Sequence, residues 1–279
     1  MADEAIPPQY KSLEGKVAIV TGGASGIGET TACLFADHGS RAVVIADIQD
    51  EKGELLVTSI GTHRCSYIHC DVADEDQVKS MVDWTIQKYG RLDIMFSNAG
   101  ILNTHQTILD LDLSAMDRLF SINVKGMAAC VKHAGRAMVE GGIKGSIVCT
   151  ASAAASVGTG RHTDYTMSKH AVLGLVRSAS RQLGRHGIRV NCVSPSGLAT
   201  PMLCQSYGMD EDGVEKVFSN STSLEGLALK VNHVAEAVLF LASDASAFVT
   251  GHNLAVDGGY VPRQPRSDPT HSFFRPVAI

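Results

Sequence analysis

Tyr165 and Lys169 carry a phenol and an ammonium group four residues apart, in the stretch TDYTMSKHAVLG. This stretch predicts a helix, on which side chains four residues apart lie on one face. A free phenol has a pKa of about 10, which is too high for a base at neutral pH. A positive charge beside the phenol favours the phenolate and lowers that pKa. The spacing indicates a proton-transfer pair, and a surface pair without a chemical role is the alternative.

A glycine-rich turn, TGGASGIG at 21–28, follows the first apolar run of the chain. Glycines directly after a parallel strand let the backbone turn sharply and approach a pyrophosphate, which free N–H groups at the next helix start can bind. A glycine cluster alone is a weak signal, but its place between a strand and a helix makes it specific. The turn predicts a dinucleotide site that includes Gly22, Ser25, Gly26, Ile27 and Gly28.

Asp47 ends the second apolar run, AVVIAD, at the position where a carboxylate can accept hydrogen bonds from the adenosine ribose. A carboxylate there repels a 2′-phosphate, and no Arg or Lys follows Asp47 until Lys52. The sequence therefore predicts NAD rather than NADP as the cofactor. A capping role for Asp47 at the next helix is the alternative, and it is compatible with ribose binding.

Two later strand ends extend the predicted cofactor site. Asp71 closes the third run, and Asp71 and the following Val72 are expected at the adenine edge. The stretch SNAG at 97–100 closes the fourth run with small residues that let the backbone approach the cofactor. These stretches add Asp71, Val72, Asn98, Ala99 and Gly100 to the predicted cofactor contacts.

Seven short apolar runs must position these residues. Such runs, separated by stretches of helical period, indicate parallel strands buried on both faces, which is the doubly wound α/β architecture. One intervening stretch, 74–90, starts with acidic residues and ends near a glycine, as a helix should. The predicted strands are 16–21, 42–47, 66–71, 92–98, 145–150, 188–193 and 253–258.

The chain of 279 residues is predicted to form one domain, because no repeat or low-complexity linker divides it. The domain spans 13–261 after an N-terminal extension at 1–12. Within it, 201–225 forms a long insertion, interpreted as a substrate lid, with apolar residues at Met202, Leu203, Tyr207, Met209 and Phe218. The tail 262–279 contains four prolines and is either a partner-binding arm or a frayed end.

Composition excludes several classes of protein. The net charge of -5, without a run of basic residues, argues against a nucleic-acid surface. No apolar run is long enough to span a membrane, and the polar N-terminus has no secretory pattern, so a cytoplasmic location is expected. The seven cysteines lack a Cys-x-x-Cys pair, which favours buried thiols in a reducing compartment. No Cys/His grouping has metal-ligand spacing, and no metal is expected.

The motifs occur together in one order: the glycine turn, SNAG, Asn123 in SINVKG, Ser152 after the fifth run, and Tyr165-x-x-x-Lys169. In this combination the chain resembles the short-chain dehydrogenase/reductase family from about Leu13 to Val261. The resemblance implies a single Rossmann-type domain with a seven-stranded parallel sheet, usually assembled as a homotetramer through paired helices.

The resemblance also implies a role for each matched residue. Ser152 would orient the substrate oxygen, and Tyr165 would be the general acid/base. Lys169 would hold the nicotinamide ribose, and Asn123 would anchor a water that feeds a proton relay. The ammonium, together with the positive nicotinamide of the oxidised cofactor, would favour the phenolate and lower the pKa of Tyr165. These four residues form the predicted catalytic group, and Tyr165 and Lys169 also count as cofactor contacts. A non-catalytic NAD-binding regulator and an NADPH-dependent carbonyl reductase are the rival classes on the same scaffold.

The stretch SPSGLATPM departs from the family pattern after the sixth run. Ser196 stands where the family usually has a glycine, and Gly197 follows one place later, which puts the substrate rim in doubt. Pro195 and Thr200 keep their expected places, with Thr200 at the cofactor carboxamide. The stretches SPSGLATPM and MFSNAGI resemble those of a plant branch of the family, which includes secoisolariciresinol, borneol and xanthoxin-type dehydrogenases.

The expected substrate pocket is apolar and carries few charges. It is formed by Leu102, 153–157, 196–198 and the lid, with Ala153, Ser196 and Gly197 beside the reacting groups. Such a pocket suits a compact apolar secondary alcohol better than a sugar or a phosphorylated metabolite. Borneol oxidised to camphor is the predicted reaction, and a lignan dehydrogenase or a xanthoxin-type dehydrogenase is the alternative. His162 is interpreted as a rim or surface residue.

Overall fold

The computed structural model describes residues 12–260. Of the predicted N-terminal extension only Ser12 is therefore described, and the predicted tail 262–279 lies outside the described residues. Seven strands form one sheet in the order β3-β2-β1-β4-β5-β6-β7, and every neighbouring pair is parallel. The strands are β1 (Val17–Thr21), β2 (Ala42–Asp47), β3 (Cys65–His69), β4 (Ile94–Ser97), β5 (Ser146–Thr150), β6 (Arg189–Pro195) and β7 (Asn253–Val256).

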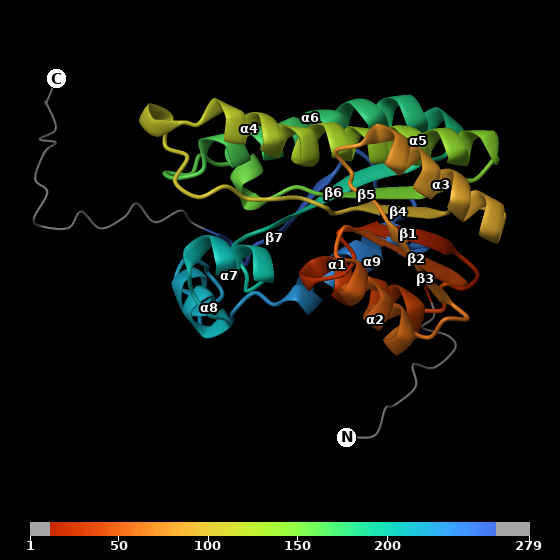
Figure 1. Ribbon diagram of the computed structural model, residues 1–279, viewed down its shortest axis with the longest axis horizontal. Coiled ribbons are helices and arrows are strands. Elements are labelled where there is room, and N and C mark those ends of the chain that lie inside the picture. The colour runs from red at the N-terminus through yellow and green to blue at the C-terminus, as the bar shows by residue number, and fades with distance from the viewer. Residues whose placement is uncertain (1–11, 261–279) are drawn as a thin grey trace, which may run out of the picture.

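Helices cover both faces of this sheet (Figure 1). One layer holds α1 (Gly26–Asp37), α2 (Asp50–Ile60) and α9 (Val231–Ala242). The other holds α3 (Glu75–Tyr89), α4 (Leu113–Phe120), α5 (Met127–Glu140) and α6 (Thr163–Leu183). Two short helices, α7 (Pro201–Tyr207) and α8 (Glu211–Ser219), lie apart from both layers (Figure 1). The predicted Rossmann-type doubly wound fold with a seven-stranded parallel sheet is confirmed.

The central strands are buried because both of their faces meet helices. Every residue of β1, β2, β4 and β5 is buried. Successive side chains of a strand point to opposite faces. In β1, Ile19 packs into the core beneath α3, α5 and α6, whereas Ala18 and Val20 pack into the core beneath α1, α2 and α9. The continuous apolar runs of the sequence are thus the expected pattern for strands between two helical layers.

Helix α3 shows why the helix boundaries could be predicted. The Asp74 carboxylate accepts hydrogen bonds from the backbone N–H groups of Asp76 and Gln77, as an N-cap should. At the other end Gly90 adopts a left-handed conformation with φ of 76°. The helix predicted for 74–90 is therefore confirmed with both of its end signals.

The helical segment from α4 to α5 is not one regular α-helix. A π-helical stretch, Ser121–Gly126, interrupts it between α4 and α5. Gly126 packs directly on Val72 in the segment after β3, where an added Cβ would lie 2.8 Å from the carbonyl oxygen of Val72. Asn123, inside the same stretch, hydrogen-bonds the backbone of Ile101. These tertiary contacts accompany the wider helical turn of the π-helical stretch. The spacing of apolar residues in the sequence does not predict such contacts.

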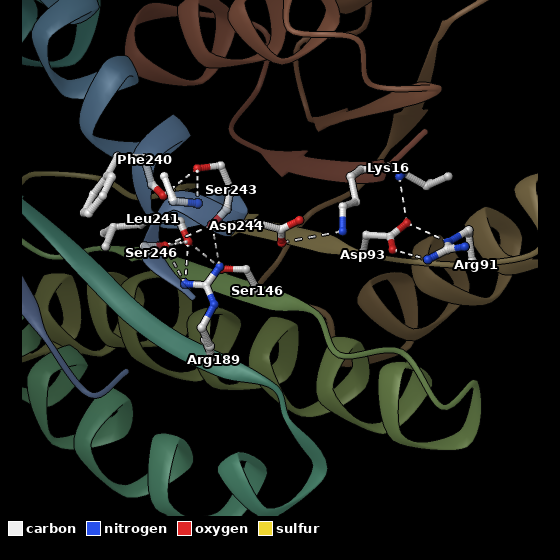
Figure 2. Close-up of polar contacts among 12 residues, drawn as sticks. Lys16, Arg91, Asp93, Ser146, Arg189, Phe240, Leu241, Ser243, Asp244 and Ser246 are labelled. Atoms are coloured by element: carbon white, nitrogen blue, oxygen red, sulfur yellow. Dashed lines mark hydrogen bonds and ion pairs between the residues drawn. The ribbon is translucent and has the colours of Figure 1, made fainter. Parts of the chain in front are cut away.

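The amino ends of the strands are tied to α9 by an arginine on β6 (Figure 2). The Arg189 guanidinium donates hydrogen bonds to the carbonyl oxygens of Leu241 and Ser243 at 2.8 and 3.0 Å. It also donates to Ser246 Oγ at 2.7 Å, and Ser146 Oγ on β5 donates to the same Leu241 carbonyl at 2.8 Å. One side chain therefore satisfies carbonyls at the C-terminus of α9, which a helix leaves without internal partners.

Arg189→Met should lower the free energy of unfolding by about 2–4 kcal/mol, because it leaves these carbonyls without their donor in a half-buried site. Chemical denaturation with a fluorescence readout measures this. Arg185→Met is the matched control, because Arg185 is exposed, and it should change the free energy of unfolding by less than about 0.5 kcal/mol. Equal effects of the two substitutions would contradict the stabilising role of Arg189 at the end of α9.

Candidate active site

A cavity of about 370 Å³ opens at the carboxyl ends of the strands, beside the β1–β4 neighbours where the strand order reverses. Parallel α/β sheets bind their ligands at this position. It brings together nearly all residues that the sequence predicted for the site. The predicted residues that line it are Gly22, Ser25, Gly26, Ile27, Asp47, Asp71, Val72, Asn98, Ala99, Gly100, Ser152, Ala153, Tyr165, Lys169, Pro195, Ser196, Gly197 and Thr200.

Two predicted residues do not line the cavity. Gly28 lies beneath the glycine turn, where an added Cβ would stand 2.0 Å from the carbonyl oxygen of Gly22. Asn123 is fully buried, and its Oδ1 accepts a hydrogen bond from Ile101 N at 2.8 Å. Its Nδ2 donates to Ile101 O at 2.9 Å and to Ser168 Oγ at 3.3 Å. The side chain thus supports the cavity wall from behind, and its predicted water-anchoring role stays a prediction.

The glycine turn between β1 and α1 is packed so tightly that side chains do not fit. Gly22 has φ of 60°, and a Cβ there would meet Ala99 Cα at 2.8 Å. The Asn98 side chain closes the arrangement by donating to the carbonyl oxygens of Thr21 and Gly22, both at 3.2 Å. Thr150 at the end of β5 donates to Asn98 Oδ1 at 2.9 Å. Asn98 therefore shapes the turn with its side chain, beyond the backbone approach expected of SNAG.

Asp47 is buried, with 6% of its surface exposed, at the end of β2. Its Oδ2 accepts a hydrogen bond from Ala24 N at 3.0 Å, and its Oδ1 accepts from Ile48 N at 2.8 Å. Gln49 adds its backbone N–H at 3.1 Å and its side-chain Nε2 at 3.2 Å. Helix α2 begins at Asp50 with Gln49 as its N-cap, so Asp47 orders the preceding turn and is not the helix cap. The carboxylate is held by four donors in the cavity wall.

The cradle formed by these residues fits a dinucleotide. No side chain caps the first turn of α1 at Ser25, so its backbone N–H groups remain available to an anion. Gly26 lines the cavity with φ of 56°, a conformation that glycine adopts without strain. Asp47 provides the acceptor that a ribose diol needs. Within residues 12–260, no group of His, Cys, Asp or Glu side chains could hold a metal ion.

The proposed reacting groups converge on the other half of the cavity. Helix α6 carries Tyr165 and Lys169 on one face, with the Lys169 Nζ 5.5 Å from the centroid of the Tyr165 ring. Lys169 is buried and donates a hydrogen bond to Thr150 O at 2.8 Å. Ser152 follows β5, and its Oγ accepts from Ala154 N at 3.1 Å, which starts the short 3-10 turn Ala153–Ala155. A hydroxyl, a phenol and an ammonium thus line one cavity.

Burial dominates the electrostatics of Tyr165 and Lys169 in the protein alone. Burial raises the pKa of Tyr165 to about 12, against an opposing hydrogen bond from Ser152. Burial also lowers the pKa of Lys169 to about 8. In the protein alone, desolvation therefore outweighs the hydrogen bond from Ser152, and the predicted lowering of the phenol pKa, which includes the positive charge of the oxidised cofactor, stays a prediction. Ionisation of Tyr165 near neutral pH requires a further positive charge beside the phenol.

The substrate side of the cavity is covered by the predicted lid. Met202, Leu203 and Tyr207 of α7 and Phe218 of α8 line it, whereas Met209 is exposed in the turn between these helices and does not. Tyr207 and Phe218 meet edge to face with ring centroids 5.6 Å apart.

The shifted glycine, Gly197, explains how this lid packs against the rest of the domain. An added Cβ at Gly197 would lie 2.2 Å from the Phe218 ring, so glycine is needed where the lid packs down. The neighbouring Ser196 is buried, and its Oγ has no hydrogen-bond partner within the described residues. The shifted glycine thus sets the packing of the substrate rim.

Sequence reasoning missed several residues of the site. Ile48 and Gln49 line the cavity directly after Asp47, and their adjacency to a predicted ribose ligand was the available signal. Tyr260 also lines it, but this residue comes from beyond β7 and no motif marks it. His162, expected at the rim or surface, is half-buried and lines the cavity. Leu102, Ala154 and Val157 contribute to the wall, whereas Ala155 packs in the core.

Fold and cavity together define a dinucleotide-binding oxidoreductase with a tyrosine–lysine pair at its reacting end. Comparison with known proteins is consistent with this class. The family described as enoyl-(acyl carrier protein) reductase matches residues 22–261. A crystal structure of a short-chain type dehydrogenase/reductase from Mycobacterium marinum aligns with a TM-score of 0.83 at 31% identity, covering 90% of this chain and 98% of that one.

Curated plant relatives are more similar in sequence. The (-)-isopiperitenol/(-)-carveol dehydrogenase, mitochondrial, of Mentha piperita is 61% identical over 250 residues, which cover 89% of this chain and 94% of the relative. The (+)-cis,trans-nepetalactol synthase NEPS2 of Nepeta racemosa is 60% identical over 253 residues, with coverage of 89% and 94%. The chain belongs to the short-chain dehydrogenase/reductase family and groups with its plant members. Among the described residues, no helix is long and apolar enough to cross a membrane.

Proposed function

We propose that this chain oxidises a secondary alcohol of a terpenoid to the ketone with NAD as the cofactor, and that borneol oxidised to camphor is one such reaction. The observation that carries the proposal is the single cavity, in which Ser152, Tyr165 and Lys169 face a space continuous with the glycine turn and Asp47. A reacting alcohol and a dinucleotide can share such a space, whereas a binding module for the dinucleotide alone has no need of the phenol.

The groups on α6 and after β5 divide the chemistry between them. Bound NAD supplies the acceptor for the hydride that leaves the carbinol carbon. Ser152 Oγ donates a hydrogen bond to the substrate oxygen, and the Tyr165 phenolate accepts the hydroxyl proton. Lys169 holds the ribose and stabilises the phenolate by its positive charge. The balanced products are the ketone, NADH and a proton that Tyr165 returns to solvent.

The cofactor choice can be tested on the unmodified protein. Because the Asp47 carboxylate repels a 2′-phosphate, kcat/KM for NAD should exceed that for NADP by at least about a hundredfold. Asp47→Ser should narrow this ratio by about tenfold or more by removing the charge. Initial rates with both cofactors measure it, and Glu29→Ser on exposed surface of α1 is the control. Equal use of the two cofactors by the unmodified protein would argue for the NADPH-dependent reductase class.

The substrate class rests on the lining of the reacting half. Leu102, Val157, Leu198 and the aromatic side chains of the lid form an apolar wall. Among residues 12–260, no Arg or Lys apart from Lys169 lines this half, so these residues offer no site for a phosphate or carboxylate. The relatives named for isopiperitenol, carveol and nepetalactol support a terpenoid. Assays with borneol and carveol test the proposal, and turnover of a lignan diol in the absence of any terpenol turnover would favour the lignan alternative.

The proposal includes two further expectations from the family resemblance, a homotetramer and a cytoplasmic location. Ile108, Leu109, Leu113 and Met167 are exposed apolar residues in or near α4 and α6, which supports association through that helical layer.

A further inference from the structure

The apolar half of the cavity contains one imidazole that the proposed chemistry does not use. His162 precedes α6, three residues before Tyr165, and lines the cavity. Its ring lies 6.1 Å from the ring of Tyr207 in the lid, measured between centroids. A polar group in an apolar wall is costly unless a ligand or the protein satisfies it. The hydrogen bonds of this imidazole therefore indicate what kind of ligand it faces.

The tautomer of His162 is fixed by the backbone. Its Nδ1 lies 3.0 Å from the carbonyl oxygen of Asn103. A carbonyl oxygen can only accept a hydrogen bond, so Nδ1 carries the proton. In the neutral ring Nε2 is then an acceptor, and it has no hydrogen-bond partner within the described residues. Burial lowers the pKa of His162, which keeps the ring neutral at physiological pH.

The support of this imidazole is rigid. The Asn103 Nδ2 donates to Ala115 O at 3.0 Å and to the buried Asp164 Oδ2 at 2.8 Å. The other oxygen of Asp164 accepts from Tyr165 N at 2.7 Å. The imidazole and the reacting tyrosine are therefore connected through one buried carboxylate, which fixes the position of both. Such preorganisation is typical of groups that recognise a ligand.

Other polar groups in this half are less selective. Tyr207 and Tyr260 line the wall, but a phenol can donate or accept a hydrogen bond. Ser196 Oγ is buried, and a hydroxyl also has both capacities. Compared with these hydroxyls, the neutral imidazole nitrogen is selective, because it accepts a hydrogen bond and cannot donate one. Its partner must carry a donor, so a hydroxyl is suitable and an ether or a ketone is not.

We propose that His162 is a specificity-determining residue that accepts a hydrogen bond from a second hydroxyl of the substrate, remote from the reacting carbinol. The preferred substrates are then terpenoid-sized diols in which one hydroxyl is oxidised and the other is recognised. This inference rests on the proposed alcohol oxidation and deepens it. Borneol, which has a single hydroxyl, is within the substrate class and is used less efficiently than a diol of the same size.

Three alcohols that differ at one position provide the test. They are 4-(2-hydroxypropan-2-yl)cyclohexanol, the methyl ether of its tertiary hydroxyl, and 4-isopropylcyclohexanol. Each has the same ring carbinol. The unmodified protein with NAD should show kcat/KM at least about tenfold higher for the diol than for the other two, since one hydrogen bond to a desolvated acceptor accounts for about that factor. The ether is the key comparison, because it has the same oxygen without the donor.

His162→Phe should remove the preference by lowering kcat/KM for the diol to the level of the ether. His162→Gln retains an acceptor of similar reach and should recover part of the preference, which separates recognition from a loss of folding. His170→Phe is the matched control, because this exposed imidazole on α6 does not line the cavity, and the substitution should leave the diol-to-ether ratio within about twofold.

The outcomes separate this inference from the proposed function. Oxidation of all three alcohols at similar rates, with no change of ratio in His162→Phe, would overturn the role of His162 and leave the alcohol oxidation standing. Failure of the unmodified protein to oxidise any of the three, or borneol or carveol, would overturn the proposed function and this inference together. A tenfold preference that survives His162→Phe would place the recognition on another residue.

Discussion

Tyr165→Phe should reduce kcat for terpenol oxidation by about three orders of magnitude and leave the Kd of NAD within about twofold of its original value. The substitution removes only the oxygen that accepts the hydroxyl proton. The ring remains on α6 with its packing against the cavity intact. Steady-state rates of NADH formation give kcat, and fluorescence titration with NADH gives an independent measure of cofactor binding.

Tyr89→Phe is the control for this substitution. The substitution also converts a phenol to a phenyl ring, but the Tyr89 hydroxyl is hydrogen-bonded to Ser66 Oγ on β3 and Tyr89 does not line the cavity. It should retain the full rate. Retention of the rate in Tyr165→Phe would remove the proposed general base, whatever the affinity for NAD.

Gly28→Ala should abolish cofactor binding at accessible concentrations and lower the free energy of unfolding by about 3 kcal/mol. The reason is geometric, since the new methyl group would stand 2.0 Å from the carbonyl oxygen of Gly22 and 2.9 Å from Gly23 Cα. Both contacts are to backbone, so the turn itself must open. Titration with NADH and chemical denaturation measure the two effects.

Gly184→Ala is the matched control for the same chemical change. Gly184 has φ of -58°, and nothing lies within 4 Å of the position that its Cβ would take. Alanine there should leave the NADH affinity unchanged. The free energy of unfolding should stay the same or rise slightly. Equal behaviour of the two variants would show that the glycine turn has no special role.

The parts of the fold that the sequence predicted are those with local signals. Each strand is a short apolar run, and the helix after β3 has an acidic N-cap at Asp74 and a left-handed glycine at Gly90. The glycine turn and Asp47 occupy consecutive strand ends, so their convergence follows from the parallel sheet itself. These features need no knowledge of distant contacts.

The features that could not be predicted depend on contacts between distant parts of the chain. The π-helical stretch is accompanied by the packing of Gly126 on Val72. The tautomer of His162 depends on Asn103, which is 59 positions away in sequence. The pKa of Tyr165 in the protein alone depends on its burial, which raises that pKa. Motif spacing shows which groups meet, but it does not show how much water they lose.

The most direct test of the proposed alcohol oxidation traces the transferred hydride from the alcohol to the cofactor. Borneol and carveol, each carrying deuterium at the carbinol carbon, are incubated with the protein and NAD, and the reduced cofactor is analysed by mass spectrometry. We expect NADH that contains the deuterium, formed together with the ketone. Tyr165→Phe should form neither product. Reduced cofactor without deuterium, or no reduced cofactor with either alcohol, would contradict the proposed alcohol oxidation.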